Sequence, residues 1–189
     1  VVTEQVSFYE EMTNVPFIIA GPGIHPRQKP VEDLLTQPTI DLLPTLCELA
    51  GIPVPSSKPG ISLAPFLKGE KQKRQHPYAA SEWHSEYEVT VSPGRMIRSP
   101  RYKYTHYLEG NGEELYDMLK DKGERRNLAH DPKYSKILAE HRALLDDYIR
   151  RTQDDYRSLK VEADKRWRSH VPGYPNHEGP CARDIINRK

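Results

Sequence analysis

The strongest constraint on the fold lies in residues 133–152, where apolar side chains recur at every third or fourth position. This spacing places them along one stripe of an α-helix, and Asp131-Pro132 suits the start of such a helix. The stripe consists of Tyr134, Ile137, Leu138, His141, Leu144, Leu145, Tyr148 and Ile149. A long helix with one apolar stripe has to bury it against another layer of structure.

Short strand-like segments precede this helix and can supply that layer. Residues 95–98 and 102–107 flank Ser99-Pro100, and the second segment alternates aromatic with polar side chains. Such alternation is typical of a half-buried strand, so we expect the two segments to pair antiparallel. A third strand is predicted at residues 114–117, after the turn signal Asn111-Gly112. The second half of the chain therefore predicts a small antiparallel sheet packed by one long helix.

The first half of the chain has the pattern of an α/β fold. Residues 15–20 form a continuous apolar run that ends at Gly21-Pro22-Gly23, which is typical of a central strand buried on both faces. Residues 39–50 have helical spacing, with Asp41 as the predicted N-cap and Gly51 as the predicted stop. Together they predict the edge of a larger α/β layer.

The stretch after this helix predicts a boundary. Residues 52–74 are rich in proline and then in charge, which suits a surface connection. We therefore expect residues 1–75 to end a large α/β domain and residues 76–153 to form the sheet-and-helix subdomain. Residues 154–189 lose the periodic pattern and are expected to form a C-terminal tail.

Composition excludes several classes of protein. The 28 basic and 27 acidic side chains leave a net charge of +1, so no strong field favours nucleic acid or an anionic membrane. No apolar run approaches the roughly 18 residues of a membrane-spanning helix. Cys47 and Cys181 lie far apart and form neither a disulfide framework nor a paired zinc motif. We expect no nucleic-acid partner and no membrane partner.

Three groups of motifs, in one order along the chain, resemble the type I sulfatases, which are the formylglycine-dependent sulfate ester hydrolases. Residues 8–23 resemble the FYEE…VPxIIxGPG stretch of that family. Residues 41–52, 60–63 and 67–69 are similar to its D-x-x-P-T-L-x-x-x-A-G-I, G-x-S-L and L-x-G series. Residues 95–98, 102–104 and 114–128 are similar to its R-x-I-R, Y-K-Y and ELYD…E…NL signatures.

The resemblance implies an α/β fold, as the C-terminal part of an alkaline-phosphatase-like sandwich with a small antiparallel sheet packed by one long helix. It also implies hydrolysis of sulfate esters, with a sulfated small molecule or a glycan such as a glycosaminoglycan as the substrate. Because family members often work outside the cytoplasm, the resemblance favours a periplasmic or secreted setting, and the chain has no N-x-S/T sequon.

The chain lacks the family's catalytic motif. In the family, the nucleophile is a Cys or Ser in C/S-x-P-x-R that is converted to formylglycine, and neither Cys47 nor Cys181 lies in such a motif. The paired aspartates that bind Ca²⁺ in the family are absent as well. The resemblance therefore implies that this chain covers roughly the last third to two fifths of a sulfatase. We expect no catalytic and no metal-binding residue here, the Ca²⁺ in the rest of its own sulfatase domain, and an inactive isolated chain.

Four residues are candidates for substrate binding. Gln5 stands where many family members have a lysine four residues before the FYEE tyrosine, and as a neutral donor it can still hydrogen-bond sulfate. Trp83 and His84 can stack on a sugar and hydrogen-bond its hydroxyl or sulfate, or be a partly buried aromatic and a loop histidine. Arg95 can pair bidentately with sulfate or uronate, or form a structural salt bridge.

Two other functions remain open from the sequence. A phosphodiesterase or phosphonate monoester hydrolase shares the same superfold, and upstream sequence with an unmodified nucleophile and extra histidines would favour it. A non-catalytic chain that binds sulfated glycan, or a remnant, belongs to a different class. A stable, monomeric isolated chain that retains glycan would favour that alternative.

Overall fold

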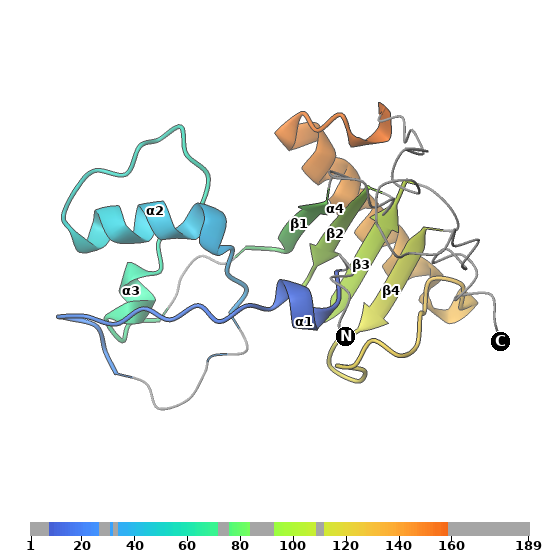
Figure 1. The fold of residues 1–189 in the computed structure, drawn as a ribbon, viewed down its shortest axis with the longest axis horizontal. Coiled ribbons are helices and arrows are strands. Elements are labelled where there is room, and N and C mark those ends of the chain that lie inside the picture. Colours follow the sequence, from blue (N-terminus) through green and yellow to red (C-terminus); the bar gives the residue numbers. More distant parts are fainter. Residues whose placement is uncertain are drawn as a thin grey trace, which may run out of the picture.

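The computed structural model describes residues 8–26, 31, 34–71, 76–83, 93–108 and 112–158. In chain order the helices are α1 (Glu10–Thr13), α2 (Pro38–Leu49), α3 (Ala64–Leu67) and α4 (Ser135–Thr152), with 3₁₀ turns at Pro132–Tyr134 and Tyr156–Ser158. The strands are β1 (Ala79–Trp83), β2 (Gly94–Arg98), β3 (Tyr102–Tyr107) and β4 (Glu113–Asp117). Figure 1 shows the sheet between α1 and α4, with α2 and α3 to one side of it.

The four strands form one antiparallel sheet in the order β1-β2-β3-β4. Ile97 on β2 lies opposite Tyr104 on β3, and Tyr104 lies opposite Leu115 on β4. The strands predicted at residues 95–98, 102–107 and 114–117 are thereby confirmed. The sequence analysis missed β1, because its Ala-Ala-Ser-Glu-Trp segment has neither β-branched side chains nor a regular apolar alternation.

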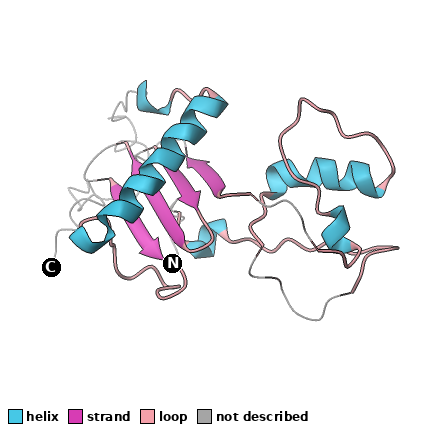
Figure 2. Cartoon of the chain, turned by 180° about the vertical axis from the view of Figure 1, so that it is seen from behind, coloured by secondary structure: helices cyan, strands magenta, loops and turns pink. Residues whose placement is uncertain are grey.

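The apolar core lies between α4 and one face of the sheet (Figure 2). Its buried members are Tyr78, Ile97, Tyr104, Leu115, Leu128, Leu138 and Leu145. The predicted helix is confirmed, and the 3₁₀ turn at Pro132–Tyr134 leads into it. The Asp131 carboxylate accepts a hydrogen bond from the Lys133 amide, which satisfies a donor that the turn leaves open.

The opposite face of the sheet carries a buried charge cluster instead of an apolar core. Lys103 on β3 is fully buried, and its Nζ donates to the Phe8 carbonyl oxygen at 2.9 Å. The same Nζ lies 2.7 Å from Glu10 Oε1 and 3.0 Å from Glu124 Oε1. The Glu10 amide in turn donates to Glu124 Oε2. These contacts hold α1 and Phe8, two residues before it, against the sheet.

The predicted N-cap of α2 needs correction. Gln37, not Asp41, is the N-cap, because Pro38 occupies the first helical position, which its fixed φ suits. Asp41 lies one turn inside the helix, where its buried carboxylate accepts hydrogen bonds from the amides of Gln37 and Ile61. Its Oδ1 also lies 2.7 Å from His76 Nε2. Asp41 therefore ties the helix to the segments that follow it.

The predicted central strand at residues 15–20 is wrong for this structure: the segment forms no strand. A strand needs a hydrogen-bonded neighbour, and within the described ranges none lies beside it. Ile18 is 86% exposed as a result. On α2, large apolar side chains are also exposed, namely Leu42, Leu43 and Leu46. Exposed apolar surface of this kind marks an interaction site.

Candidate functional site

The structure offers neither a metal site nor a membrane helix in the part that it describes. No group of three or more His, Cys, Asp or Glu side chains in the described ranges is placed to hold a metal ion. The described residues therefore do not supply the set of ligands that the Ca²⁺ of the family needs. No helix formed by the described residues is long and apolar enough to span a bilayer.

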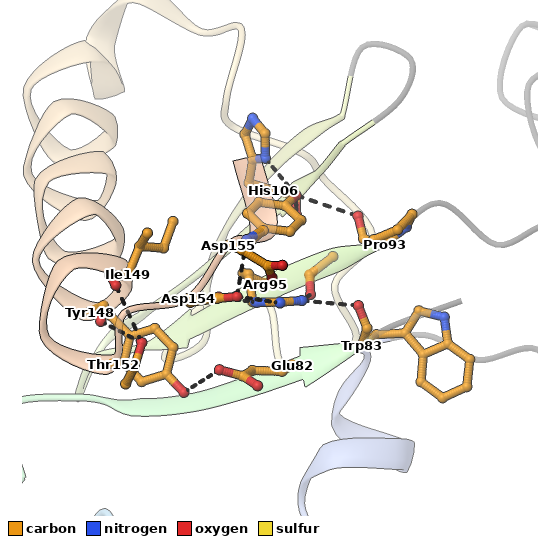
Figure 3. Close-up of polar contacts among 12 residues, drawn as sticks. Glu82, Trp83, Pro93, Arg95, His106, Tyr148, Ile149, Thr152, Asp154 and Asp155 are labelled. Atoms are coloured by element: carbon orange, nitrogen blue, oxygen red, sulfur yellow. Dashed lines mark hydrogen bonds and ion pairs between the residues drawn. The ribbon is translucent and has the colours of Figure 1, made fainter. Parts of the chain in front are cut away.

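The candidate site lies at the end of the sheet where β1 ends and β2 begins. Trp83 is the last residue of β1 and pairs with Gly94 across the ladder. Its side chain is partly buried and, in Figure 3, points away from Arg95 and α4. The indole Nε1 is shielded from solvent and has no hydrogen-bond partner in the described structure. Trp83 thus places a partly buried indole at this end of the sheet, on the side away from α4.

Arg95 lies next to Trp83 and is only 1% exposed. Its Nε and Nη2 donate to the two carboxylate oxygens of Asp154 at 2.6 and 2.8 Å, which is a bidentate ion pair. Its Nη1 donates to the carbonyl oxygens of Trp83 and Gly94. Each of its three nitrogens therefore has a protein acceptor.

The charge of Arg95 is stabilised from two sides. Burial by itself lowers the pKa of Arg95, but the hydrogen bonds and the charge of Asp154 outweigh that effect and raise it. The guanidinium carbon also lies 4.5 Å from the centre of the Tyr156 ring, within the range of a cation–π contact. Arg95 therefore stays charged while it donates to the Trp83 carbonyl oxygen.

Tyr156 connects the same cluster to the start of β2. Its fully buried hydroxyl donates to the His106 carbonyl oxygen at 2.8 Å and lies 3.4 Å from the Pro93 carbonyl oxygen. The hydroxyl also lies 2.8 Å from His106 Nδ1. Burial raises the pKa of Tyr156 and lowers that of His106, so both side chains are neutral near pH 7.

A further contact fixes the edge strand to the helix. The Tyr148 hydroxyl on α4 donates to Glu82 Oε1 on β1 at 2.7 Å. Figure 3 shows this contact beside the Arg95–Asp154 pair, on the side nearer α4. Glu82 is therefore anchored directly to α4, whereas its neighbour Trp83 is linked to the segment after α4 only through Arg95.

The structure describes two of the four predicted substrate-binding residues. Trp83 and Arg95 lie together, while Gln5 and His84 lie outside the described residues. Asp154 and Tyr156 were missed, because the sequence after the helix shows charge without a regular pattern. The structure packs both against the sheet, although the predicted boundary assigned them to the tail.

A second bidentate pair lies at the other end of the sheet. Arg101, in the turn between β2 and β3, donates through Nη2 to Asp117 Oδ2 at 2.7 Å and through Nε at 3.2 Å. Its side chain is partly exposed. The pair has the same chemistry as Arg95–Asp154 but lies away from Trp83. Its disruption is therefore a control for disruption of the Arg95–Asp154 pair.

Comparison with known proteins identifies the family. The C-terminal model of N-sulphoglucosamine sulphohydrolase matches residues 4–151. The chain is 76% identical to a Delta 4,5-hexuronate-2-O-sulfatase of Bacteroides thetaiotaomicron over 188 residues, covering 100% of this chain and 39% of that protein. The chain thus spans about two fifths of the length of that relative.

Solved structures agree with this comparison. A 2-O GAG sulfatase superposes with a TM-score of 0.82 at 76% identity, over 97% of this chain and 40% of that chain. An enzyme solved with its substrate D-glucosamine-2-N,6-O-disulfate matches with a TM-score of 0.55 at 27% identity, over 62% of this chain and 25% of that chain.

These similarities confirm the predicted fold class, an α/β alkaline-phosphatase-like fold whose C-terminal part is an antiparallel sheet packed by one long helix. They also confirm the family that the ordered motifs indicated. The chain belongs to the sulfatase family and corresponds to its C-terminal portion.

Proposed function

We propose that the protein containing this chain is a sulfatase that hydrolyses the 2-O-sulfate ester of an unsaturated hexuronate released from a glycosaminoglycan. The 76% identity to a Delta 4,5-hexuronate-2-O-sulfatase along the whole chain carries the proposal. The match to a 2-O GAG sulfatase structure supports the same substrate class. The formylglycine nucleophile and the Ca²⁺ are assigned to the rest of the sulfatase domain.

In this proposal the chain completes the fold of that domain. The apolar segment 15–20, in which Val15 and Ile18 are exposed, and the exposed leucines of α2 form the surface that the rest of the domain covers. Covering apolar area is favourable by about 25 cal/mol per Å². The exposure of Ile18 and Leu46 supports this assignment.

The chain also shapes the substrate mouth through Trp83. An indole stacked on the apolar face of a sugar ring gains area and a favourable ring contact. Trp83 supports this role because its side chain is only partly buried and points away from the core that α4 packs. Gln5 and His84 are proposed to hydrogen-bond sulfate or hydroxyl groups. Arg95 acts through the Trp83 carbonyl, since its nitrogens already bond protein acceptors.

The test of the activity uses the purified full-length protein. Sulfate release is measured from an unsaturated 2-O-sulfated hexuronate disaccharide, from the same disaccharide with sulfate only on the glucosamine, and from an aryl sulfate. A phosphonate monoester is assayed in parallel. We expect the highest kcat/KM on the 2-O-sulfated uronate. Faster hydrolysis of the phosphonate monoester would assign the protein to the other branch of the superfold.

The test of Trp83 compares two substitutions in the full-length protein. Trp83→Ala removes the stacking surface and is expected to raise KM for the disaccharide about three- to tenfold, as the loss of an aromatic contact of about 0.5–1.5 kcal/mol implies. Trp83→Phe keeps an aromatic face and should retain most of the affinity. An unchanged KM in Trp83→Ala would remove Trp83 from the substrate site.

A further inference from the structure

We infer that Asp154, Arg95 and Tyr156 form a positioning unit that sets the place of Trp83 for substrate binding. The inference rests on the proposed function, because Trp83 is the group that contacts the sugar there. None of the three positioning residues needs to touch the substrate. The unit lies outside the sequence motifs of the family, apart from Arg95 itself.

The unit holds both described residues that flank residues 84–92. Arg95 Nη1 donates to the carbonyl oxygen of Trp83 at 3.0 Å, on the β1 side. The Tyr156 hydroxyl lies 3.4 Å from the carbonyl oxygen of Pro93, on the β2 side. Figure 3 shows Trp83 and Pro93 with their carbonyl groups on the same side of Arg95 as its contact with Trp83. The segment after α4 thereby contacts Pro93 directly through Tyr156 and Trp83 indirectly, through the Arg95 side chain that Asp154 holds.

The unit is stiff because its charges are buried and satisfied. The side chains of Arg95 and Asp154 are 1% and 9% exposed, and two hydrogen bonds join them. The planar guanidinium has one orientation in which it can bind both Asp154 oxygens and still reach the Trp83 carbonyl. Asp154 also accepts the amide of Tyr156, which places the ring against the guanidinium. A displacement of the Asp154 side chain therefore moves the Arg95 guanidinium, and with it the hydrogen bond to the Trp83 carbonyl.

Substrate affinity depends on such positioning. Binding groups have to be held within about 0.5 Å of their productive geometry by the residues behind them. Without the Asp154 charge, Arg95 loses its bidentate partner and can leave the Trp83 carbonyl for other acceptors. The sugar contact then weakens, while the reacting groups elsewhere in the domain keep their geometry.

The test measures steady-state kinetics of full-length Asp154→Asn, which preserves the side-chain shape and removes the charge. We expect KM for the unsaturated 2-O-sulfated disaccharide to rise about tenfold, the scale of one lost hydrogen bond to a charged group, with kcat within about twofold. A small alkyl sulfate, which has no ring to stack on the indole, should show unchanged kinetics. The matched control is Asp117→Asn, which breaks the Arg101 pair and should leave both substrates unaffected.

A loss of kcat on both substrates, or an unchanged KM on the disaccharide, would overturn the inference. If Asp154→Asn does not yield folded protein, Tyr156→Phe decides, because it keeps the ring and removes the hydroxyl that contacts Pro93 and His106. Its KM for the disaccharide should rise about two- to fivefold, as for one neutral hydrogen bond. An unchanged KM in this variant would overturn the inference as well.

A readout that needs no turnover separates this inference from the proposed function. The protein is labelled with 5-fluorotryptophan, and the ¹⁹F signal of Trp83 is assigned by its loss in Trp83→Phe. We expect the signal to shift or broaden in Asp154→Asn and to stay in place in Asp117→Asn. An unmoved Trp83 signal overturns the positioning role, whereas a failure of the wild type to cleave the uronate overturns only the function.

Discussion

The ammonium group of Lys103 lies 2.7 Å from Glu10 Oε1, although Lys103 is the second residue of β3 and Glu10 begins α1. Glu124, in the connection after β4, completes the cluster at 3.0 Å from the same nitrogen. Three motifs that are far apart in the sequence, FYEE, Y-K-Y and the glutamate after ELYD, thus meet at one buried cation. Their joint presence has a physical reason, because each supplies a charge that the others need.

Lys103→Met tests this cluster. The substitution keeps the length of the side chain but takes the Lys103 ammonium away from Glu124 and leaves Glu10 with Arg98, 3.7 Å away. Breaking a buried ion pair in this way costs about 3–5 kcal/mol, so we expect a clearly lower midpoint of urea unfolding in the full-length protein. The control is Arg126→Met, which removes an exposed pair with Asp131 and should cost at most about 1 kcal/mol. Equal midpoints for the two variants would contradict the prediction.

The protonation of Glu114, which lies on the same face of the sheet as Lys103, should make the stability of the protein depend on pH. Burial, reinforced by the charge of Glu124 and opposed by Lys103, raises the pKa of Glu114 to about 7. A carboxyl group with a raised pKa stabilises the fold while it is protonated, and this contribution is lost as pH rises from about 4.5 to 7. Glu114→Gln should therefore gain stability over the wild type above pH 7 and little near pH 5. The measurement is the melting temperature of the full-length protein between these values.

Glu113 is the matched control for that experiment, since it is the preceding residue of β4 and faces the other way. Its hydrogen bonds to Arg142 outweigh its burial and lower its pKa to about 2. A carboxyl group with a lowered pKa stabilises the fold when ionised, and this contribution is lost only as pH falls from about 4.5 to 2. Glu113→Gln should lower the melting temperature by the same amount at pH 5 and pH 8. A shift that differs between these two pH values would assign the pH dependence elsewhere.

Periodicity predicted the parts of the fold in which one face of an element is buried. The apolar stripe of α4 and the alternation in β3 both follow from contact with one shared core. The strand predicted at residues 15–20 was wrong. The apolar run there is typical of a buried strand, but the described residues contain no partner strand beside it. Asp41 was misplaced because its hydrogen bonds to Ile61 and His76 depend on tertiary contacts.

The candidate site was predictable only where its residues are neighbours in sequence or belong to a motif. Trp83 was chosen by residue type, and Arg95 as a cation of the R-x-I-R motif that can bind sulfate or uronate. Asp154 lies 59 residues after Arg95, in a charge-rich stretch where one aspartate looks like any other. An ion pair across that distance leaves no periodic signal, so the structure was needed to find it.

Substitution of Gly60 should destabilise the protein, because Gly60 lies against a backbone carbonyl that Pro44 of α2 leaves without its helical hydrogen bond. Pro44 has no N–H for the Ile40 carbonyl, and Gly60 packs against that carbonyl oxygen. A Cβ at Gly60 would lie 2.1 Å from the oxygen, and the φ of +114° disfavours a side chain as well. Gly60→Ala should therefore lower the melting temperature strongly. Gly51→Ala, at φ +69° with nothing near the added Cβ, should cost only about 1 kcal/mol, and equal effects would refute the close-contact argument.

The exposed leucines of α2 offer a test of the proposed covering by the rest of the sulfatase domain. Leu46 is 50% exposed in this chain and Leu119, after β4, is 66% exposed. If Leu46 is covered in the full-length protein, Leu46→Asp buries an unpaired charge there, which costs several kcal/mol. We expect little soluble full-length protein with this substitution and a wild-type yield with Leu119→Asp, measured by expression followed by size-exclusion chromatography. A wild-type yield and melting temperature for Leu46→Asp would place this side of α2 in solvent and leave the apolar stripe of the helix without its proposed partner.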